Sequence, residues 1–110
     1  MVTIKEAEMQ TGITRQNIRY YEKIGLLQPS REQENKYRNY REEDIRRLKL
    51  IFLFRKLDMP LEEIRQLLEG TIELQDALQM QKEMLEERQQ KLQAAISFCG
   101  QIEEKELTQL

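Results

Sequence analysis

The 110-residue sequence contains no histidine, one cysteine, two prolines and four glycines. The absence of histidine excludes most acid–base and nucleophilic catalysis. A single cysteine excludes an intramolecular disulfide framework and the paired-ligand spacing of zinc sites. The glycines are not spaced as in a phosphate-binding loop, so nucleotide binding is not expected. We therefore predict a protein that is not an enzyme and that uses no metal and no cofactor.

The sequence also lacks a long apolar stretch. Its hydrophobic content is 39%, its charged content is 35% and its mean hydropathy is −0.76. No segment approaches the ~20 apolar residues of a membrane span. Lys5 and Glu6 interrupt the region where a signal peptide would have its apolar core. Together with the cysteine usage, these features favour a cytoplasmic protein with no membrane partner.

The net charge of −2 is unevenly distributed along the chain. Residues 1–60 contain 13 Lys and Arg against 9 Asp and Glu, whereas residues 61–110 contain 5 against 11. Nucleic-acid binding depends on the local field rather than on the total charge, so an acidic total does not exclude it. The asymmetry predicts two parts with different roles.

The N-terminal region predicts a helix-turn-helix. Thr3 and Glu6 have the spacing of a capping box, and Gly12 is suited to end the helix that they begin. Thr14 is suited to begin a second helix, which Gly25 ends. Two short helices joined by a tight turn that contains glycine are typical of this unit.

Residues 27–40 break the helical pattern and predict a small β-hairpin wing. A helical pattern returns at Glu42, is interrupted at Asp58 and resumes at Pro60, which we expect at the first helical position, until Gly70. Asp tolerates left-handed backbone geometry better than most residues, so we expect Asp58 to form the turn between these two helices.

Residues 72–107 predict one long helix with an apolar stripe that repeats every seven residues. A heptad stripe requires a partner helix, and a second copy of the chain is the simplest one. The candidate dimerisation residues are Leu74, Leu78, Leu85, Leu92, Ile96, Cys99 and Ile102. By default Cys99 is a small packing residue within this stripe, and the alternative is a thiol sensor.

Two sets of residues are candidates for DNA contact. On the second helix, Arg15 and Arg19 lie four apart on one face, near Gln16 and Tyr20. Arg and Gln match the hydrogen-bonding edges of guanine and adenine in the major groove. The wing adds Arg38, Tyr37 and Tyr40, which are suited to contact phosphates. Alternatively, exposed arginines on an amphipathic helix form an ordinary solvated face.

The order of these elements resembles the MerR family of bacterial transcription regulators. The similarity rests on Arg19-Tyr20-Tyr21, on Ile24-Gly25-Leu26-Leu27, on the Tyr37-Arg38-x-Tyr40 pattern and on Leu61-Glu62-Glu63-Ile64. The resemblance is close over about residues 2–70 and extends in kind to the long helix.

The resemblance implies a mainly α fold in two parts. These are a winged helix-turn-helix DNA-binding domain at residues 1–70 and an antiparallel coiled-coil dimerisation helix with a short tail at residues 71–110. It places Thr14, Arg15, Arg19 and Tyr20 on a recognition helix and Tyr37, Arg38 and Tyr40 on a wing. It also matches Arg55 to a position that contacts the DNA backbone.

The implied function is that of a homodimeric transcription regulator. Such a dimer binds an inverted repeat in promoter DNA and, on a signal that the resemblance does not identify, distorts the DNA so that RNA polymerase can engage it. The acidic second half leaves one alternative open, a helical module that recruits a protein partner instead of DNA. A third possibility is a regulator that responds to thiol-reactive agents through Cys99.

Overall fold

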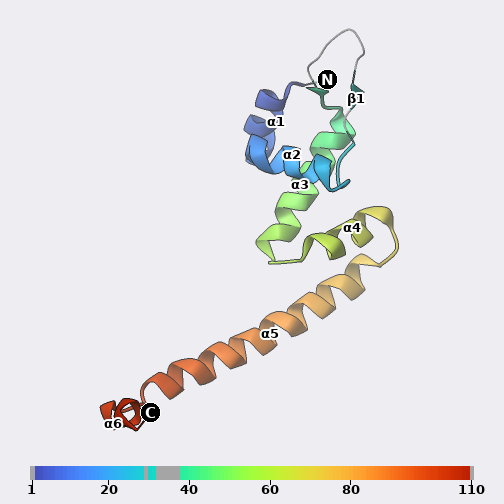
Figure 1. Ribbon diagram of the computed structural model, residues 1–110. Coiled ribbons are helices and arrows are strands. Elements are labelled where there is room, and N and C mark those ends of the chain that lie inside the picture. The colour runs from blue at the N-terminus through green and yellow to red at the C-terminus, as the bar shows by residue number, and fades with distance from the viewer. Residues whose placement is uncertain (1, 29, 32–37, 110) are drawn as a thin grey trace. The chain divides into compact units, whose positions relative to one another are not determined.

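The computed structural model describes residues 2–28, 30–31 and 38–109 (Figure 1). Within them the chain is mainly helical, with six helices and two short strands. It divides into two compact units, Met1–Ile72 and Glu73–Leu110. The boundary after residue 70 between a DNA-binding domain and a dimerisation helix stays a prediction.

The first unit is built from four helices, with α1 packed against α2 and α3, and α3 packed against α4. Their bounds are Ile4–Thr11 for α1, Arg15–Lys23 for α2, Glu42–Lys56 for α3 and Leu61–Glu69 for α4. Each helix contributes apolar side chains to one shared core. The side chains that are at most 1% exposed include Ala7, Ile18, Leu26, Leu27, Tyr40, Leu48, Ile51, Met59 and Ile64.

The ends of α1 and α2 follow the predicted caps. The Thr3 hydroxyl accepts the Glu6 N–H at 3.2 Å, and the Thr14 hydroxyl accepts the Asn17 N–H at 3.2 Å. Gly12 ends α1 at φ 76°, a left-handed conformation that glycine adopts without steric cost. In a complete capping box the Glu6 carboxylate would also accept the Thr3 backbone N–H. The structure differs, because the Thr3 hydroxyl donates to the Glu6 carboxylate at 3.3 Å.

The turn between α3 and α4 contains the left-handed residue that the sequence predicts. Asp58 has φ 60°. Pro60 is the N-cap of α4 and Leu61 is its first residue, so the expected position of Pro60 inside the helix is wrong by one residue. The fixed φ of proline suits either position, because neither needs a backbone donor there.

Two strands, β1 (Ser30–Arg31) and β2 (Arg38–Asn39), pair antiparallel with Ser30 opposite Asn39 and Arg31 opposite Arg38. Residues 32–37, which join them, lie outside the described residues. Immediately after β2, Tyr40 forms an antiparallel bridge with Val2 through two backbone hydrogen bonds of 2.8 and 2.9 Å. The start of the chain is therefore tied to the end of the strand pair.

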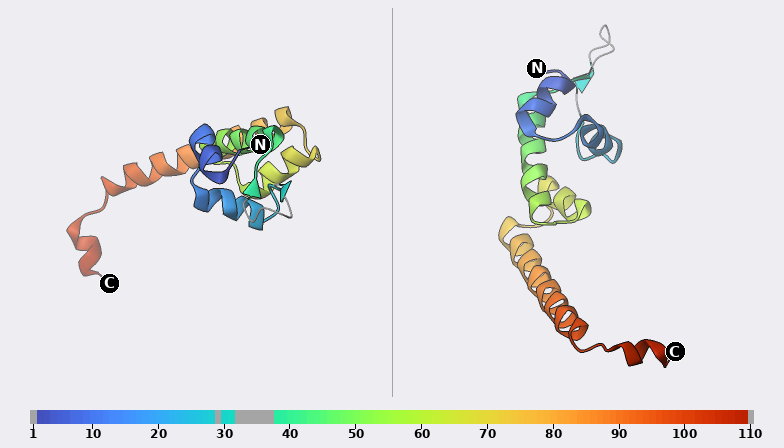
Figure 2. Two further views of the ribbon diagram at one scale, coloured as in Figure 1. Left: turned by 90° about the horizontal axis from the view of Figure 1, so that it is seen from above. Right: turned by 90° about the vertical axis from the view of Figure 1, so that its left-hand side faces the viewer.

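The second unit consists of α5 (Leu74–Cys99) and the short α6 (Glu104–Thr108). The predicted single helix over residues 72–107 is wrong at its C-terminal end, where Figure 2 shows a break before α6. Gly100 begins the break, and glycine is among the least favourable residues in a helix interior. As a result, Ile102 lies in the connection, outside the heptad repeat of α5.

Candidate nucleic-acid interface

The helix α2 separates a buried apolar side from an exposed polar side. Ile18 and Tyr21 are 0% and 8% exposed and anchor α2 to the core of the first unit. The remaining side carries the residue types that can read base edges. Its exposed side chains include those of Arg15, Gln16, Asn17, Arg19 and Tyr20.

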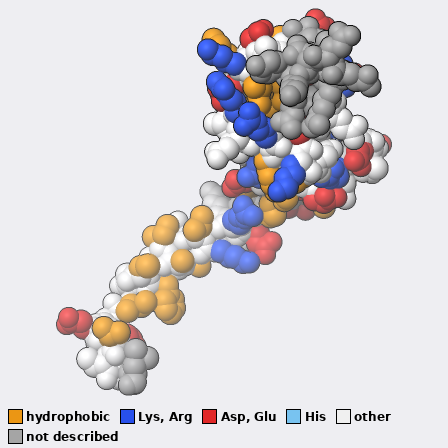
Figure 3. Space-filling view, turned by 45° about the horizontal axis from the view of Figure 1, so that its top comes forward, with side chains coloured by type: hydrophobic (Ala, Val, Ile, Leu, Met, Phe, Trp, Pro, Cys, Tyr) orange, Lys and Arg blue, Asp and Glu red, His pale blue; other side chains and the backbone are white. Residues whose placement is uncertain are grey.

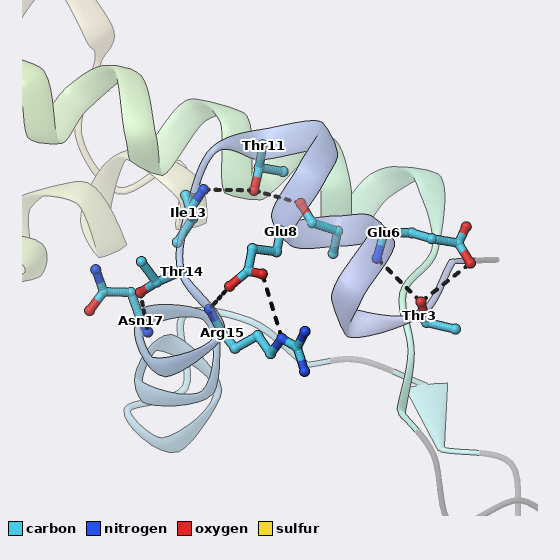
Figure 4. A network of polar contacts seen from close by, with 9 residues as sticks. Thr3, Glu6, Glu8, Thr11, Ile13, Thr14, Arg15 and Asn17 are labelled. Carbon is cyan, nitrogen blue, oxygen red and sulfur yellow. Dashed lines mark hydrogen bonds and ion pairs between the residues drawn. The ribbon is translucent and has the colours of Figure 1, made fainter.

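A carboxylate from α1 holds the first residue of α2 at two points (Figure 4). The Arg15 backbone N–H donates to Glu8 Oε2 at 2.8 Å, and Arg15 Nε lies 3.5 Å from Glu8 Oε1. The first turn of α2 contains no acidic residue. Glu8 therefore supplies the negative charge that a helix N-terminus favours. The sequence analysis did not find this contact, because its partners belong to different helices.

A cleft of about 460 Å³ brings the start of α2 together with the end of α3. Its lining includes Thr14, Tyr20 and Arg55, all of which were candidates from the sequence. Arg55 Nη1 donates to the Met59 carbonyl at 2.7 Å, which fixes the guanidinium at the edge of the cleft. A fixed cation beside an N-cap hydroxyl and a tyrosine is well suited to contact a phosphate.

One further residue of this cleft, Lys56, extends the sequence-based candidates. Lys56 lines it, and its Nζ lies 4.8 Å from the centre of the Phe52 ring. This cation–π contact positions a second positive charge next to Arg55. Burial raises the pKa of Tyr21 above its ordinary value, and the positive charge of Arg55 partly opposes that rise. The Phe52–Lys56 spacing of four residues is the signal that could have identified Lys56.

The predicted wing residues have different outcomes. Tyr40, expected to contact phosphate, is completely buried and donates its hydroxyl hydrogen to Glu22. The prediction of a phosphate contact is therefore wrong for Tyr40, because burial and the hydrogen bond to Glu22 make it a core residue. Arg38 lies in β2, and Tyr37 lies outside the described residues.

Two arginines from the later helices hold the end of α2. Arg47 Nε donates to the Leu26 carbonyl at 2.6 Å, and Arg65 Nη2 donates to the Ile24 carbonyl. Carbonyls at a helix C-terminus lack partners within the helix, and Arg65 satisfies that of the C-cap residue Ile24, whereas Arg47 holds the chain just after the helix at Leu26. Gly25 lies between them at φ 82°. The sequence analysis missed both contacts, because they join residues far apart in the chain.

The candidate dimerisation residues on α5 are largely exposed in the single chain, and Figure 3 shows hydrophobic side chains gathered along this helix. Leu74, Leu78, Leu92 and Ile96 are 38–65% exposed, and Leu85 is half-buried. Cys99, the last residue of α5, is also exposed. None of the helices in the described part of the chain is long and apolar enough to span a membrane.

The sequence matches two described families of proteins. It matches the MerR HTH family of regulatory proteins over residues 2–71, which is more than half of the chain, and the MerR DNA-binding family over residues 45–107. The chain belongs to the MerR family. MerR-family proteins are DNA-binding transcription regulators and not enzymes.

Individual MerR-family proteins support the same assignment. The HTH-type transcriptional activator mta of Bacillus subtilis is 31% identical over 94 residues, which are 84% of this chain and 37% of mta. The heavy metal-dependent transcription regulator 2 of Rhizobium meliloti is 37% identical over 67 residues, which are 61% of this chain and 46% of that regulator. The chain therefore spans less than half of either relative.

The structure of this MerR-family chain is also similar to a solved structure. The crystal structure of MtaN, the N-terminal part of the Bacillus subtilis multidrug transporter activator, matches with a TM-score of 0.84 and 28% identity. The match covers 92% of this chain and 96% of MtaN. The mainly helical fold with a long C-terminal helix is thus a MerR-type fold.

Proposed function

We propose that this chain binds promoter DNA as a homodimer and regulates transcription from an inverted-repeat operator. The observation that carries the proposal is the exposed polar side of α2, with Arg15, Gln16, Arg19 and Tyr20 on one surface and Arg55 beside it. In this arrangement α2 enters the major groove, where Arg and Gln distinguish base pairs. Within a bacterial cell, such a regulator would act in the cytoplasm.

Phosphate contacts fix the position of α2 in the groove. Arg55 and Lys56 lie on the cleft that begins at the N-cap of α2, so they can hold the backbone next to the bases that α2 reads. The β1–β2 pair acts as a wing whose Arg38 contacts the flanking backbone, and the resemblance implies the same role for Tyr37, which lies outside the described residues. This wing role rests on the MerR resemblance and on the antiparallel pairing of β1 with β2.

The apolar stripe of α5 supplies the dimer. Leu92 and Ile96 are 65% and 64% exposed in the single chain. A row of large apolar side chains exposed to water marks an interaction surface. Two copies pack these stripes against each other in an antiparallel coiled coil. The dimer then presents two α2 helices to the two halves of an inverted repeat.

Regulation follows from the deformation of DNA by this dimer. The resemblance to the MerR family implies that the two promoter elements are spaced too widely for RNA polymerase. It also implies that a signal makes the dimer bend and untwist the DNA between them. Backbone contacts such as those proposed for Arg55 supply the energy for the distortion. RNA polymerase is therefore the second macromolecular partner.

Selection of binding sites from random duplexes by the purified protein tests the proposal directly. We expect an inverted repeat whose half-sites are separated by a fixed distance, and a binding constant that falls steeply with salt because phosphate contacts release counterions. A helical module that recruits a protein instead of DNA would select no common sequence and would show a shallow salt dependence. That result would favour the alternative suggested by the acidic second half.

A further inference from the structure

Glu8 stands out on the proposed DNA-binding surface because it is an acidic residue in contact with a base-reading arginine. Its carboxylate accepts the Arg15 backbone N–H through one oxygen and pairs with Arg15 Nε through the other (Figure 4). The side chains of Glu8 and Arg15 are 36% and 47% exposed, so both reach the surface. Capping of α2 needs only the bond to the Arg15 backbone N–H, so neither capping nor the fold of α1 requires the contact between Glu8 and Arg15 Nε.

The double attachment distinguishes this pair from an ordinary surface ion pair. Exposed ion pairs stabilise little, largely because two long side chains must be held in one geometry. Here the 2.8 Å hydrogen bond from the backbone already fixes the carboxylate, so only the arginine side chain remains to be ordered. The guanidinium is therefore oriented before any DNA is present, and less side-chain freedom is lost when it binds a base.

The orientation also decides which part of the guanidinium is free. Glu8 contacts the guanidinium through Nε (Figure 4), and the two terminal nitrogens of Arg15 are its remaining donors. These two nitrogens form the fork that matches O6 and N7 of guanine. At the same time, the negative charge of Glu8 reduces the attraction of Arg15 for phosphates of any sequence.

We infer that Glu8 is a positioning residue that sets sequence specificity by holding Arg15 for one guanine and by weakening its attraction to DNA of other sequences. The inference rests on the proposed function and deepens it by assigning base discrimination to a residue that touches no base. Specificity here is a difference between two affinities, and Glu8 changes both in the direction that widens it.

The decisive variant is Glu8→Gln, because glutamine keeps an oxygen that can accept the Arg15 backbone N–H but removes the charge. Gel shifts would compare the selected operator with a random duplex at several salt concentrations. We expect the specificity ratio to fall by about fivefold, within the range that one bidentate base contact provides. We also expect the salt slope on the random duplex to steepen by ~0.9 as Arg15 becomes free to contact a phosphate.

The matched control is Glu6→Gln, which removes the same charge from the same helix, where Glu6 contacts Thr3 and not Arg15. Glu6→Gln should change both affinities by the same factor and leave the ratio unaltered. In an Arg15→Ala background, Glu8→Gln should no longer change the ratio. Thermal unfolding of each variant separates these effects from loss of helix stability.

Repeating the site selection with Glu8→Gln and with Arg15→Ala gives an independent test. Both variants should lose preference at the same base pair of each half-site, whereas Arg19→Ala should lose it at a different one. Equal ratios for Glu8→Gln and Glu6→Gln, or an effect of Glu8→Gln that persists without Arg15, would overturn the role of Glu8 while leaving DNA binding intact. Failure of the unaltered protein to bind any duplex would overturn the proposed function itself.

Discussion

The two units of this chain treat their apolar side chains in opposite ways. In the first unit, Leu48, Ile51 and Ile64 are 0% exposed and belong to one core. In the second unit, Leu92 and Ile96 are more than 60% exposed on a helix of 26 residues. Short helices packed on one another can bury their own apolar faces, whereas an apolar stripe left exposed on a single helix can be buried only against a further helix, for which we propose a second copy of the chain.

This difference in burial implies that the two units of this MerR-type chain are stabilised in different ways. The first unit has a core of its own, so its stability is a property of one chain. If α5 pairs with a second copy as proposed, the stability of the second unit depends on protein concentration. The following predictions sharpen or break this contrast.

The largest expected effect is on the core of the first unit. Leu48→Ala removes a completely buried side chain and should lower the free energy of unfolding by about 2–5 kcal/mol. Leu53→Ala is the control, because Leu53 lies on the same helix α3 but is 53% exposed. Urea unfolding followed by circular dichroism measures both. Equal losses for the two variants would show that the core has been assigned wrongly.

Next in size is the effect on dimerisation. Leu92→Glu places a charge in the α5 stripe of both copies and should weaken the dimer by about 3 kcal/mol, which corresponds to losing the burial of these leucines. Gln90→Glu is the matched control, because residue 90 projects from the opposite side of the helix. Sedimentation equilibrium gives both dissociation constants. A dimer that tolerates Leu92→Glu would place the interface elsewhere.

A smaller effect is expected on recognition of bases. Arg19→Ala should cost about 1–3 kcal/mol on the selected operator and relax the preference at one base pair. Lys23→Ala removes a positive charge from the last turn of the same helix and should weaken operator and random duplex alike. Gel shifts at fixed salt measure the affinity of both variants for the operator and for the random duplex. If Arg19→Ala also weakened both duplexes equally, Arg19 would be a phosphate contact.

The smallest expected effect is on the attachment of α2 to α4. Arg65→Ala removes the hydrogen bond to the Ile24 carbonyl and should lower the free energy of unfolding by about 1 kcal/mol. Arg65→Lys retains the charge and should recover part of this loss. Thermal unfolding measures both variants. An unchanged midpoint for Arg65→Ala would show that water replaces the guanidinium at no cost.

Local interactions account for what could be predicted from the sequence. Thr3 and Thr14 each cap a helix through an amide three residues later, and Asp58 supplies the left-handed turn before Pro60. Such contacts depend on neighbours in the chain, so their residue types and spacing are visible without a structure. The end of α5 at Cys99 was missed although Gly100 was present, because the apolar repeat continues past it to Ile102.

Contacts between distant segments account for what could not be predicted. Tyr40 bonds to Glu22 across 18 residues, and Arg65 bonds to Ile24 across 41. A tyrosine near a basic segment suggests a phosphate contact until its burial is known. Nothing in the spacing of Glu8 and Arg15, which belong to different helices, indicates that they meet.

The amino-acid sequence alone determined where helices begin and which faces are apolar, because helix caps and hydrophobic periodicity act over a few residues. The same periodicity predicts a partner for α5. Only the tertiary structure decided which polar side chains remain free to meet DNA. Tyr40 is buried in the core, Arg47 and Arg65 hold the chain at and just after the end of α2, and Arg15 is paired with Glu8. The physical reason is that a donor or acceptor has a limited number of bonds, and the packing of distant helices determines where they are made.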